Sequence, residues 1–115
     1  MARTPDQVFE GLIEEQSSLR GIEVGKMFGS PVLKMRGRVF AMLVKKRLVV
    51  KLPKERVDKL LQSPGFKRFD PGHGKPSKEW VAVDVSASRR WRSLVDEARE
   101  FVVSAGRKST RRRGG

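Results

Sequence analysis

The stretch that decides the fold is KMFGSPVLKMRGRVFAMLVKKRLVVKL, residues 26–52. Apolar and polar residues alternate through much of it with a period of two, which is the pattern of β-strands, and short turn signals separate the runs. Strands that follow one another this closely pair as antiparallel hairpins. The pattern predicts a short strand at Lys26–Phe28, a break at Gly29–Pro31 and strands at 32–35, 38–44 and 47–52.

Lys45 and Lys46 separate the last two strands, which is the spacing of a tight hairpin. A two-residue turn needs positive φ, to which lysine is poorly suited, so we expect a loop that is a residue or two longer. The register predicts one buried face, made of Val39, Ala41, Leu43, Leu48, Val50 and Leu52. The other face mixes cations with apolar side chains, namely Arg38, Phe40, Met42, Arg47, Val49 and Lys51.

Amphipathic helices flank the hairpins on both sides. Thr4-Pro5-Asp6-Gln7 carries the signals of a capping box, and the apolar spacing after it predicts a helix from about Pro5 to Leu19. A last helix is predicted from about Ser88 to Ala105 by the spacing of its apolar residues. Between them we expect a helix at 53–62, strands at 66–69 and 79–85, and a loop at 70–77.

The predicted fold class is α+β, an antiparallel β-sheet of hairpins with five or six strands, packed by the N- and C-terminal helices. The 115 residues suit a single domain, which we place at residues 1–105, followed by a disordered basic tail at 106–115. The chain has no cysteine, which excludes disulfides and thiolate sites and suits a reducing compartment. With no apolar signal core and no long apolar segment, we expect a cytoplasmic protein without membrane association.

The charge is large and unevenly placed. Lysine and arginine number 26 against 13 acids, and residues 24–54 contain nine basic residues and no acid. Removing the five basic residues of the last ten from the net charge of +13 leaves +8, so the predicted domain is itself basic. Clustered positive charge favours polyanionic partners, although a solvated basic surface that aids solubility is an alternative.

The chain has few residues of the types that enzymes use for catalysis. The single histidine, His73, lies in a loop rich in glycine and proline, and Asp70 is the only acid near it in sequence. A general base needs an oriented partner, so we interpret His73 as a solvent-exposed loop residue. Gly72–Lys75 lacks the spacing and the following helix of a phosphate-binding loop. We expect no catalytic residue, no metal site and no cofactor.

Arg89, Arg90 and Arg92 fall in the first turn of the predicted last helix, where the helix dipole disfavours cations. Residues that stand against a local structural preference, here the preference of a helix N-terminus for acidic residues, mark a candidate functional site. The helix N-terminus and the three arginines would together suit a phosphate group. The alternative is that Arg92 pairs with Asp96 one turn later and that the other two are solvated.

Three aromatic residues have two interpretations each. Trp80 and Trp91 could stack on bases, as aromatic side chains do in proteins that bind single strands. Core packing is favoured for both, because each stands among apolar residues at the local structural period. Phe40 lies on the predicted hairpin face that also carries cations, and its alternative is cover by a neighbouring helix.

The order of elements resembles the N-terminal domain of the bacterial TfoX family and its YjbR-like relatives, over roughly residues 26–103. The residues that carry the resemblance are Met27-Phe28-Gly29, Gly37, Val39–Leu43, Arg47–Leu52, Gly74-Lys75-Pro76 and Trp80-Val81, followed by the closing amphipathic helix. The resemblance implies a compact α+β fold, no known active site and an association with DNA-related regulation. This chain departs from the full-length regulator in lacking its second domain, and from the family in its Lys45-Lys46 turn and arginine-rich tail.

The leading functional prediction is a small non-enzymatic bacterial protein that binds nucleic acid non-specifically through phosphate contacts. The alternative is a protein-interaction or regulatory adaptor domain without direct nucleic-acid binding. Binding to an anionic membrane surface is disfavoured because the first helix is acidic. The residues predicted to contact phosphates are Lys34, Arg36, Arg38, Lys45, Lys46, Arg47, Lys51, Arg89, Arg90, Arg92, Arg111, Arg112 and Arg113.

Overall fold

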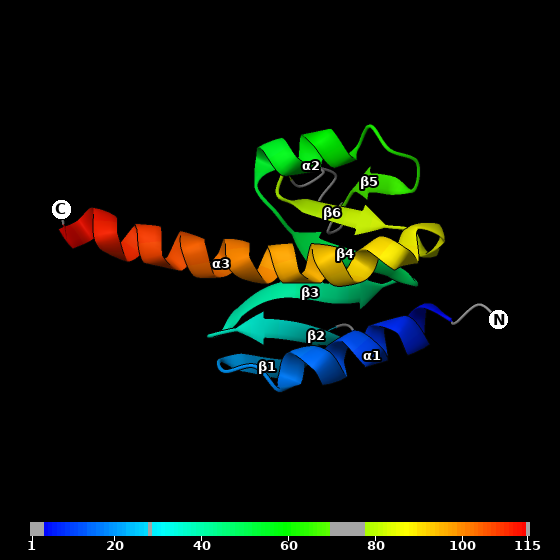
Figure 1. The fold of residues 1–115 in the computed structure, drawn as a ribbon, viewed down its shortest axis with the longest axis horizontal. Coiled ribbons are helices and arrows are strands. Elements are labelled where there is room, and N and C mark those ends of the chain that lie inside the picture. The colour runs from blue at the N-terminus through cyan, green and yellow to red at the C-terminus, as the bar shows by residue number, and fades with distance from the viewer. Residues whose placement is uncertain (1–3, 28, 70–77, 115) are drawn as a thin grey trace.

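The computed structural model describes residues 4–27, 29–69 and 78–114, with side chains up to residue 105. In this part of the chain six strands form one sheet in the order β1-β2-β3-β4-β6-β5, and all neighbouring strands are antiparallel (Figure 1). The predicted α+β class, an antiparallel sheet with N- and C-terminal helices, is confirmed. The elements are α1 (Pro5–Ser17), β1 (Ile22–Met27), β2 (Ser30–Met35), β3 (Arg38–Val44), β4 (Arg47–Lys51), α2 (Lys54–Leu60), β5 (Phe66–Arg68), β6 (Trp80–Val83), the 3-10 helix η1 (Val85–Arg90) and α3 (Trp91–Gly114).

The first helix begins as its sequence predicts. The backbone N–H of Gln7 donates to the Thr4 hydroxyl oxygen at 3.1 Å, and the backbone N–H of Thr4 donates to Oε1 of Gln7 at 3.0 Å. This reciprocal pair is the capping box, which satisfies backbone donors that a helix start otherwise leaves open. The helix ends at Ser17, two residues before the expected end, and Leu19 is 41% exposed.

Strand β1 begins at Ile22, four residues before the predicted start, and β2 begins inside the predicted break. The prediction missed the first four residues of β1 because this edge strand is largely solvent-exposed and because Gly25 and Lys26 interrupt its apolar alternation. Pro31 lies near the start of β2, ahead of the pairing with β3 that begins at Val32. A proline is tolerated there because no ladder hydrogen bond from its nitrogen is required.

A bulge in β3 changes which side chains enter the core. Leu33 pairs with Ala41 whereas Lys34 pairs with Val39, so Phe40 is an extra residue between two pairs. Phe40 is therefore fully buried on the same side of the sheet as Ala41, and Val39 belongs to the opposite side. The predicted faces were wrong at these two positions, and the alternative that helices cover Phe40 is confirmed.

The two faces of the sheet differ in what covers them. On the inner face, the helices contribute Phe9, Leu12, Val57, Leu60, Trp91, Leu94, Val95, Ala98 and Val102 to the main core. The outer face carries a smaller cluster of Val32, Met42, Val49 and Ala82, to which none of the described helix side chains belongs. Trp91 is fully buried in the inner core, as predicted, whereas Trp80 is only partly buried and packs against the outer cluster.

The last helix differs from expectation at both ends. Arg89 and Arg90 lie in η1, so α3 begins at Trp91. At the other end α3 continues to Gly114, past the predicted end at Ala105 and through the segment expected to be a disordered tail. Extending an existing helix by one residue is far easier than starting one, because only the first turn carries the nucleation cost.

Candidate nucleic-acid interface

Two tight turns of the sheet are built from cations in a conformation that L-residues rarely adopt. Among the described residues, the non-glycine residues with positive φ are Arg36 at 52°, Lys45 at 50° and Lys46 at 66°. Arg36 turns β2 into β3 together with Gly37, and the two lysines turn β3 into β4. The expected longer loop at Lys45 and Lys46 was wrong, because a two-residue turn with both φ positive matches the twist of the strands.

Most of the predicted cations have no acidic partner. Within the described part of the chain, the following residues of the predicted set form no ion pair: Lys34, Arg36, Arg38, Lys45, Lys46, Lys51, Arg89 and Arg90. Arg47 is the exception on the hairpin, with its Nε 3.8 Å from Oδ1 of Asp84. The charges of the others are therefore available to a ligand.

The three arginines near the start of α3 have different surroundings. Nε of Arg92 lies 3.2 Å from Oε1 of Glu15 on α1, so the alternative pairing with Asp96 was wrong. Arg90 lies over the ring of Phe66, with its guanidinium carbon 5.1 Å from the ring centroid, and Arg89 is exposed. Arg89 and Arg90 stand in the last turn of η1, directly before α3, so that of the three arginines only Arg92 lies in the first turn of α3.

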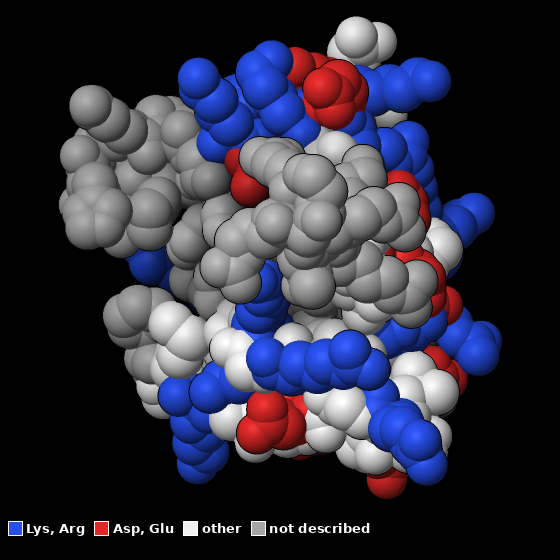
Figure 2. All heavy atoms as spheres, turned by 90° about the vertical axis from the view of Figure 1, so that its left-hand side faces the viewer, with Lys and Arg blue, Asp and Glu red and all other residues white. Residues whose placement is uncertain are grey.

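The structure divides the unpaired cations of the hairpins into two groups at opposite ends of the sheet. We call Lys45 and Lys46 the hairpin tip. Strand β4 returns from that tip, so that Lys51 at its end lies at the same end of the sheet as Arg38, the first residue of β3. Together with Arg36, these two residues form what we call the basic end. Figure 1 shows α3 extending past this end, and Figure 2 shows Lys and Arg side chains over much of its described surface.

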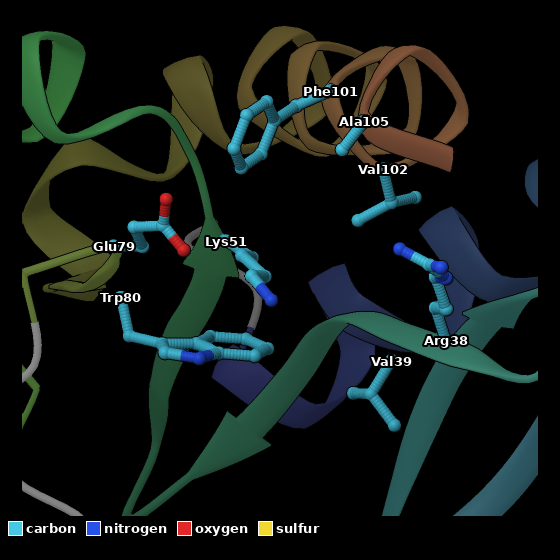
Figure 3. A pocket seen from close by; sticks show the side chains of 8 residues that line it. All are labelled: Arg38, Val39, Lys51, Glu79, Trp80, Phe101, Val102 and Ala105. Carbon is cyan, nitrogen blue, oxygen red and sulfur yellow. The ribbon is translucent and has the colours of Figure 1, made fainter. Parts of the chain in front are cut away.

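A pocket of about 460 Å³ opens at the basic end, between the sheet and α3. The ring of Trp80 forms its floor, and Arg38 and Lys51 point their charged groups toward the hollow from different sides (Figure 3). Nζ of Lys51 lies 5.9 Å from the centroid of the Trp80 ring. The lining residues are Arg38, Val39, Lys51, Glu79, Trp80, Phe101, Val102 and Ala105.

Sequence reasoning included Arg38 and Lys51 in the candidate interface but missed the pocket. The sequence favours core packing for Trp80, and Phe101 carries no signal beyond the helical spacing of the apolar residues around it. These residues come from β3, β4, β6 and α3, and Lys51 and Trp80 face each other only because β4 pairs with β6. No local pattern encodes that pairing. The one available signal was the alternative of base stacking by Trp80.

The carboxylates that lie among cations are held ionised. A hydrogen bond from the backbone of Ser86 lowers the pKa of Asp84 below its ordinary value of 3.8, and the charges of Arg47 and Lys67 act in the same direction. Hydrogen bonds from Lys54 and Arg68 likewise lower the pKa of Asp58. Both groups are exposed, so the shifts report their neighbours rather than burial.

Other predicted features are not placed. The side chains of Arg111, Arg112 and Arg113 and the whole of His73 and Asp70 lie outside the described residues. Within the described part, no group of three or more His, Cys, Asp or Glu residues is arranged to hold a metal ion. No described helix combines the length and apolar character that crossing a bilayer requires.

In a comparison with known proteins, no protein family, curated protein or solved structure matches this chain. The resemblance to the TfoX N-terminal family therefore stays a prediction.

Proposed function

We propose that this protein binds nucleic acid non-specifically through phosphate contacts and does not catalyse a reaction. The observation that carries the proposal is that the three residues with positive φ, Arg36, Lys45 and Lys46, are all exposed cations without an ion pair to a described residue. Glycine or asparagine would suit these positions better, since the left-handed conformation costs other residues about 1–2 kcal/mol each. A strained backbone conformation at a cation that has no ion-pair partner among the described residues points to a use outside the chain.

The spacing of the two groups suits a repeating polyanion. Strand β3 has seven residues, so about 20 Å separates the hairpin tip from the basic end. A duplex carries one phosphate charge per ~1.7 Å of its axis, so one short segment can reach both groups. Arginine can bind a phosphate with two parallel hydrogen bonds, while lysine acts as a point charge. A cytoplasmic location, which the sequence favours, is part of the same proposal.

The test is a fluorescence anisotropy titration of a labelled duplex at several salt concentrations. If the five cations of the two groups each neutralise one phosphate, the slope of log affinity against log salt is roughly −4.5. In the double variant Lys45→Gln/Lys46→Gln the slope of log affinity against log salt should be shallower by about 1.8, because two phosphate contacts are removed. Affinity should vary little with sequence, since phosphate contacts do not read bases.

The matched control is Lys26→Gln/Lys59→Gln, which removes the same charge from exposed positions outside both groups. Its slope should stay near that of the wild type. If both double variants flattened the slope by the same amount, total charge rather than the two groups of cations would determine binding. Absence of binding at low salt would overturn the proposal.

One observation favours a protein partner as the second candidate. Leu19, Val24 and Met27 are large apolar residues that are 41%, 49% and 39% exposed, and the last two lie on the edge strand β1. An edge strand with apolar side chains can pair with a strand of another chain. Partners that remain bound to the purified protein after nuclease treatment of a lysate would support this candidate, and partners lost on treatment would support nucleic-acid binding.

A further inference from the structure

We infer that the pocket at the basic end binds one unpaired nucleotide, with the base against Trp80 and the phosphate beside Arg38. This inference deepens the proposed function, because it predicts a preference for single-stranded over duplex nucleic acid. The ligand that the pocket would bind, a planar base that carries a phosphate, occurs both as a nucleotide within a strand and as a free mononucleotide. The experiment below separates those two sources.

The Trp80 ring offers an aromatic surface for stacking once the flexible Lys51 side chain, whose Nζ lies 5.9 Å from the ring centroid, moves aside. Trp80 packs on the outer cluster and is partly buried, and Figure 3 shows its ring facing the hollow. Phe101, also partly buried, reaches toward the same hollow from α3. Bases of any sequence stack on aromatic side chains because each has a π-face.

The charges around the hollow orient such a ligand. Arg38 and Lys51 form no ion pair with a described residue, and their charged groups point toward the hollow (Figure 3). Glu79 lines the side of the hollow away from Arg38. The guanidinium group of Arg38 can bind a phosphate with two parallel hydrogen bonds. The phosphate is therefore expected at Arg38, with the base over the indole ring and Lys51 between the two.

The size and position of the pocket select an unpaired base. Its volume of about 460 Å³ lies within the ~300–1,000 Å³ range of small-molecule sites. A base inside a duplex has both faces covered by its neighbours, so it must leave the stack before it can reach the Trp80 ring. A base in a single strand enters without that unpairing.

The experiment compares oligothymidylate with an abasic oligonucleotide of equal length and with a duplex, at one fixed salt concentration. All three carry a phosphate backbone, so only the base contact differs between the first two. We expect the abasic strand to bind at least about fivefold more weakly, which is the low end for one stacked base. Stacking should also quench tryptophan fluorescence from Trp80, because Trp91 is fully buried and cannot be reached.

Trp80→Phe keeps an aromatic ring in the pocket and leaves Trp91 as the only fluorophore, so oligothymidylate should no longer quench emission. Arg38→Gln changes an exposed residue and should weaken oligothymidylate binding, whereas Lys59→Gln, an exposed cation on α2, should leave it nearly unchanged. Circular dichroism of each variant checks that it is folded. Should Trp80→Phe fail to fold, Arg38→Gln with the abasic comparison still decides.

Two results would overturn the inference. Equal affinity for abasic and base-bearing strands without quenching would remove the base site while the phosphate-binding proposal stands. If no oligonucleotide binds at low salt, the proposed function fails, and thymidine monophosphate alone then tests the pocket. Quenching of Trp80 by thymidine monophosphate would support a mononucleotide site in the pocket. If the monophosphate does not quench, the mononucleotide site is excluded too.

Discussion

At the scale of single residues, Gln16 is the polar side chain that the described structure buries, at 3% exposure. Its Nε2 donates to Oδ1 of Asp96 at 2.9 Å, and its Oε1 accepts from Nη1 of Arg99 at 2.7 Å, which ties α1 to α3. Replacing it with alanine leaves both partners with an unmet hydrogen bond. We expect Gln16→Ala to lower the free energy of unfolding by about 1–3 kcal/mol in urea denaturation.

Gln62→Ala is the control for that substitution, because Gln62 is exposed and lies just beyond α2. It should change the stability by less than about 0.5 kcal/mol. A Gln16→Ala protein as stable as the control would show that water replaces the bridge between the helices.

A second residue-scale prediction concerns acid stability. The backbone N–H of Ser86 donates to Oδ2 of Asp84 at 3.0 Å, and this contact keeps the pKa of Asp84 below 3.8 in the folded state. A depressed pKa contributes stability that is present above pH 3.8 and is lost as the pH falls through the folded value. The Asp84→Asn variant should therefore show a smaller loss of stability than the wild type between pH 7 and about pH 3. Parallel losses in the two proteins would contradict the assignment.

At the scale of elements, the two lysines of the β3–β4 turn are predicted to lower the stability of the fold while they supply positive charge for binding. Asparagine and glycine are the residues that favour a two-residue turn with both φ positive. We expect Lys45→Asn/Lys46→Gly to raise the free energy of unfolding by about 2–4 kcal/mol while it weakens duplex binding. Thermal unfolding and the anisotropy titration measure the two effects. A variant that is both more stable and equally strong in binding would remove the functional reason for the lysines.

The packing of α3 on the sheet gives the other element-scale prediction. Trp91 is fully buried, and its Nε1 donates to the backbone carbonyl of Asp84 at 3.2 Å. Replacing it with alanine leaves a large cavity between α3 and the inner face. We expect Trp91→Ala to cost about 3–5 kcal/mol, measured by urea denaturation. An unchanged unfolding midpoint would contradict its burial.

At the scale of the whole molecule, the two cation groups are predicted to act independently on one polyanion. The hairpin tip and the basic end lie at opposite ends of the sheet, and distant sites without shared partners have additive effects. A variant that combines Lys45→Gln and Lys46→Gln with Arg38→Gln should lose the summed binding free energy of the separate variants, within about 0.5 kcal/mol. A combined loss clearly smaller than that sum would mean that the two groups do not act independently on the ligand.

The sequence by itself determined the features that depend on neighbouring residues. The capping box at Thr4 and Gln7, the hairpin strands 38–44 and 47–51, and the burial of Trp91 follow from local hydrogen bonding and from the period of apolar residues. It also identified the cations of the two turns, because their excess over acids is visible in the chain itself.

Only the tertiary structure decided how distant residues combine. The bulge that moves Phe40 into the core arises from the pairing of β3 with β2, and the partner of Arg92 from the packing of α1 beside α3. The pocket exists because β4 pairs with β6 and α3 packs on β3 and β4, which brings Lys51, Trp80 and Phe101 together. Such contacts depend on the free energy of packing the whole sheet, and a short stretch of sequence does not determine that free energy.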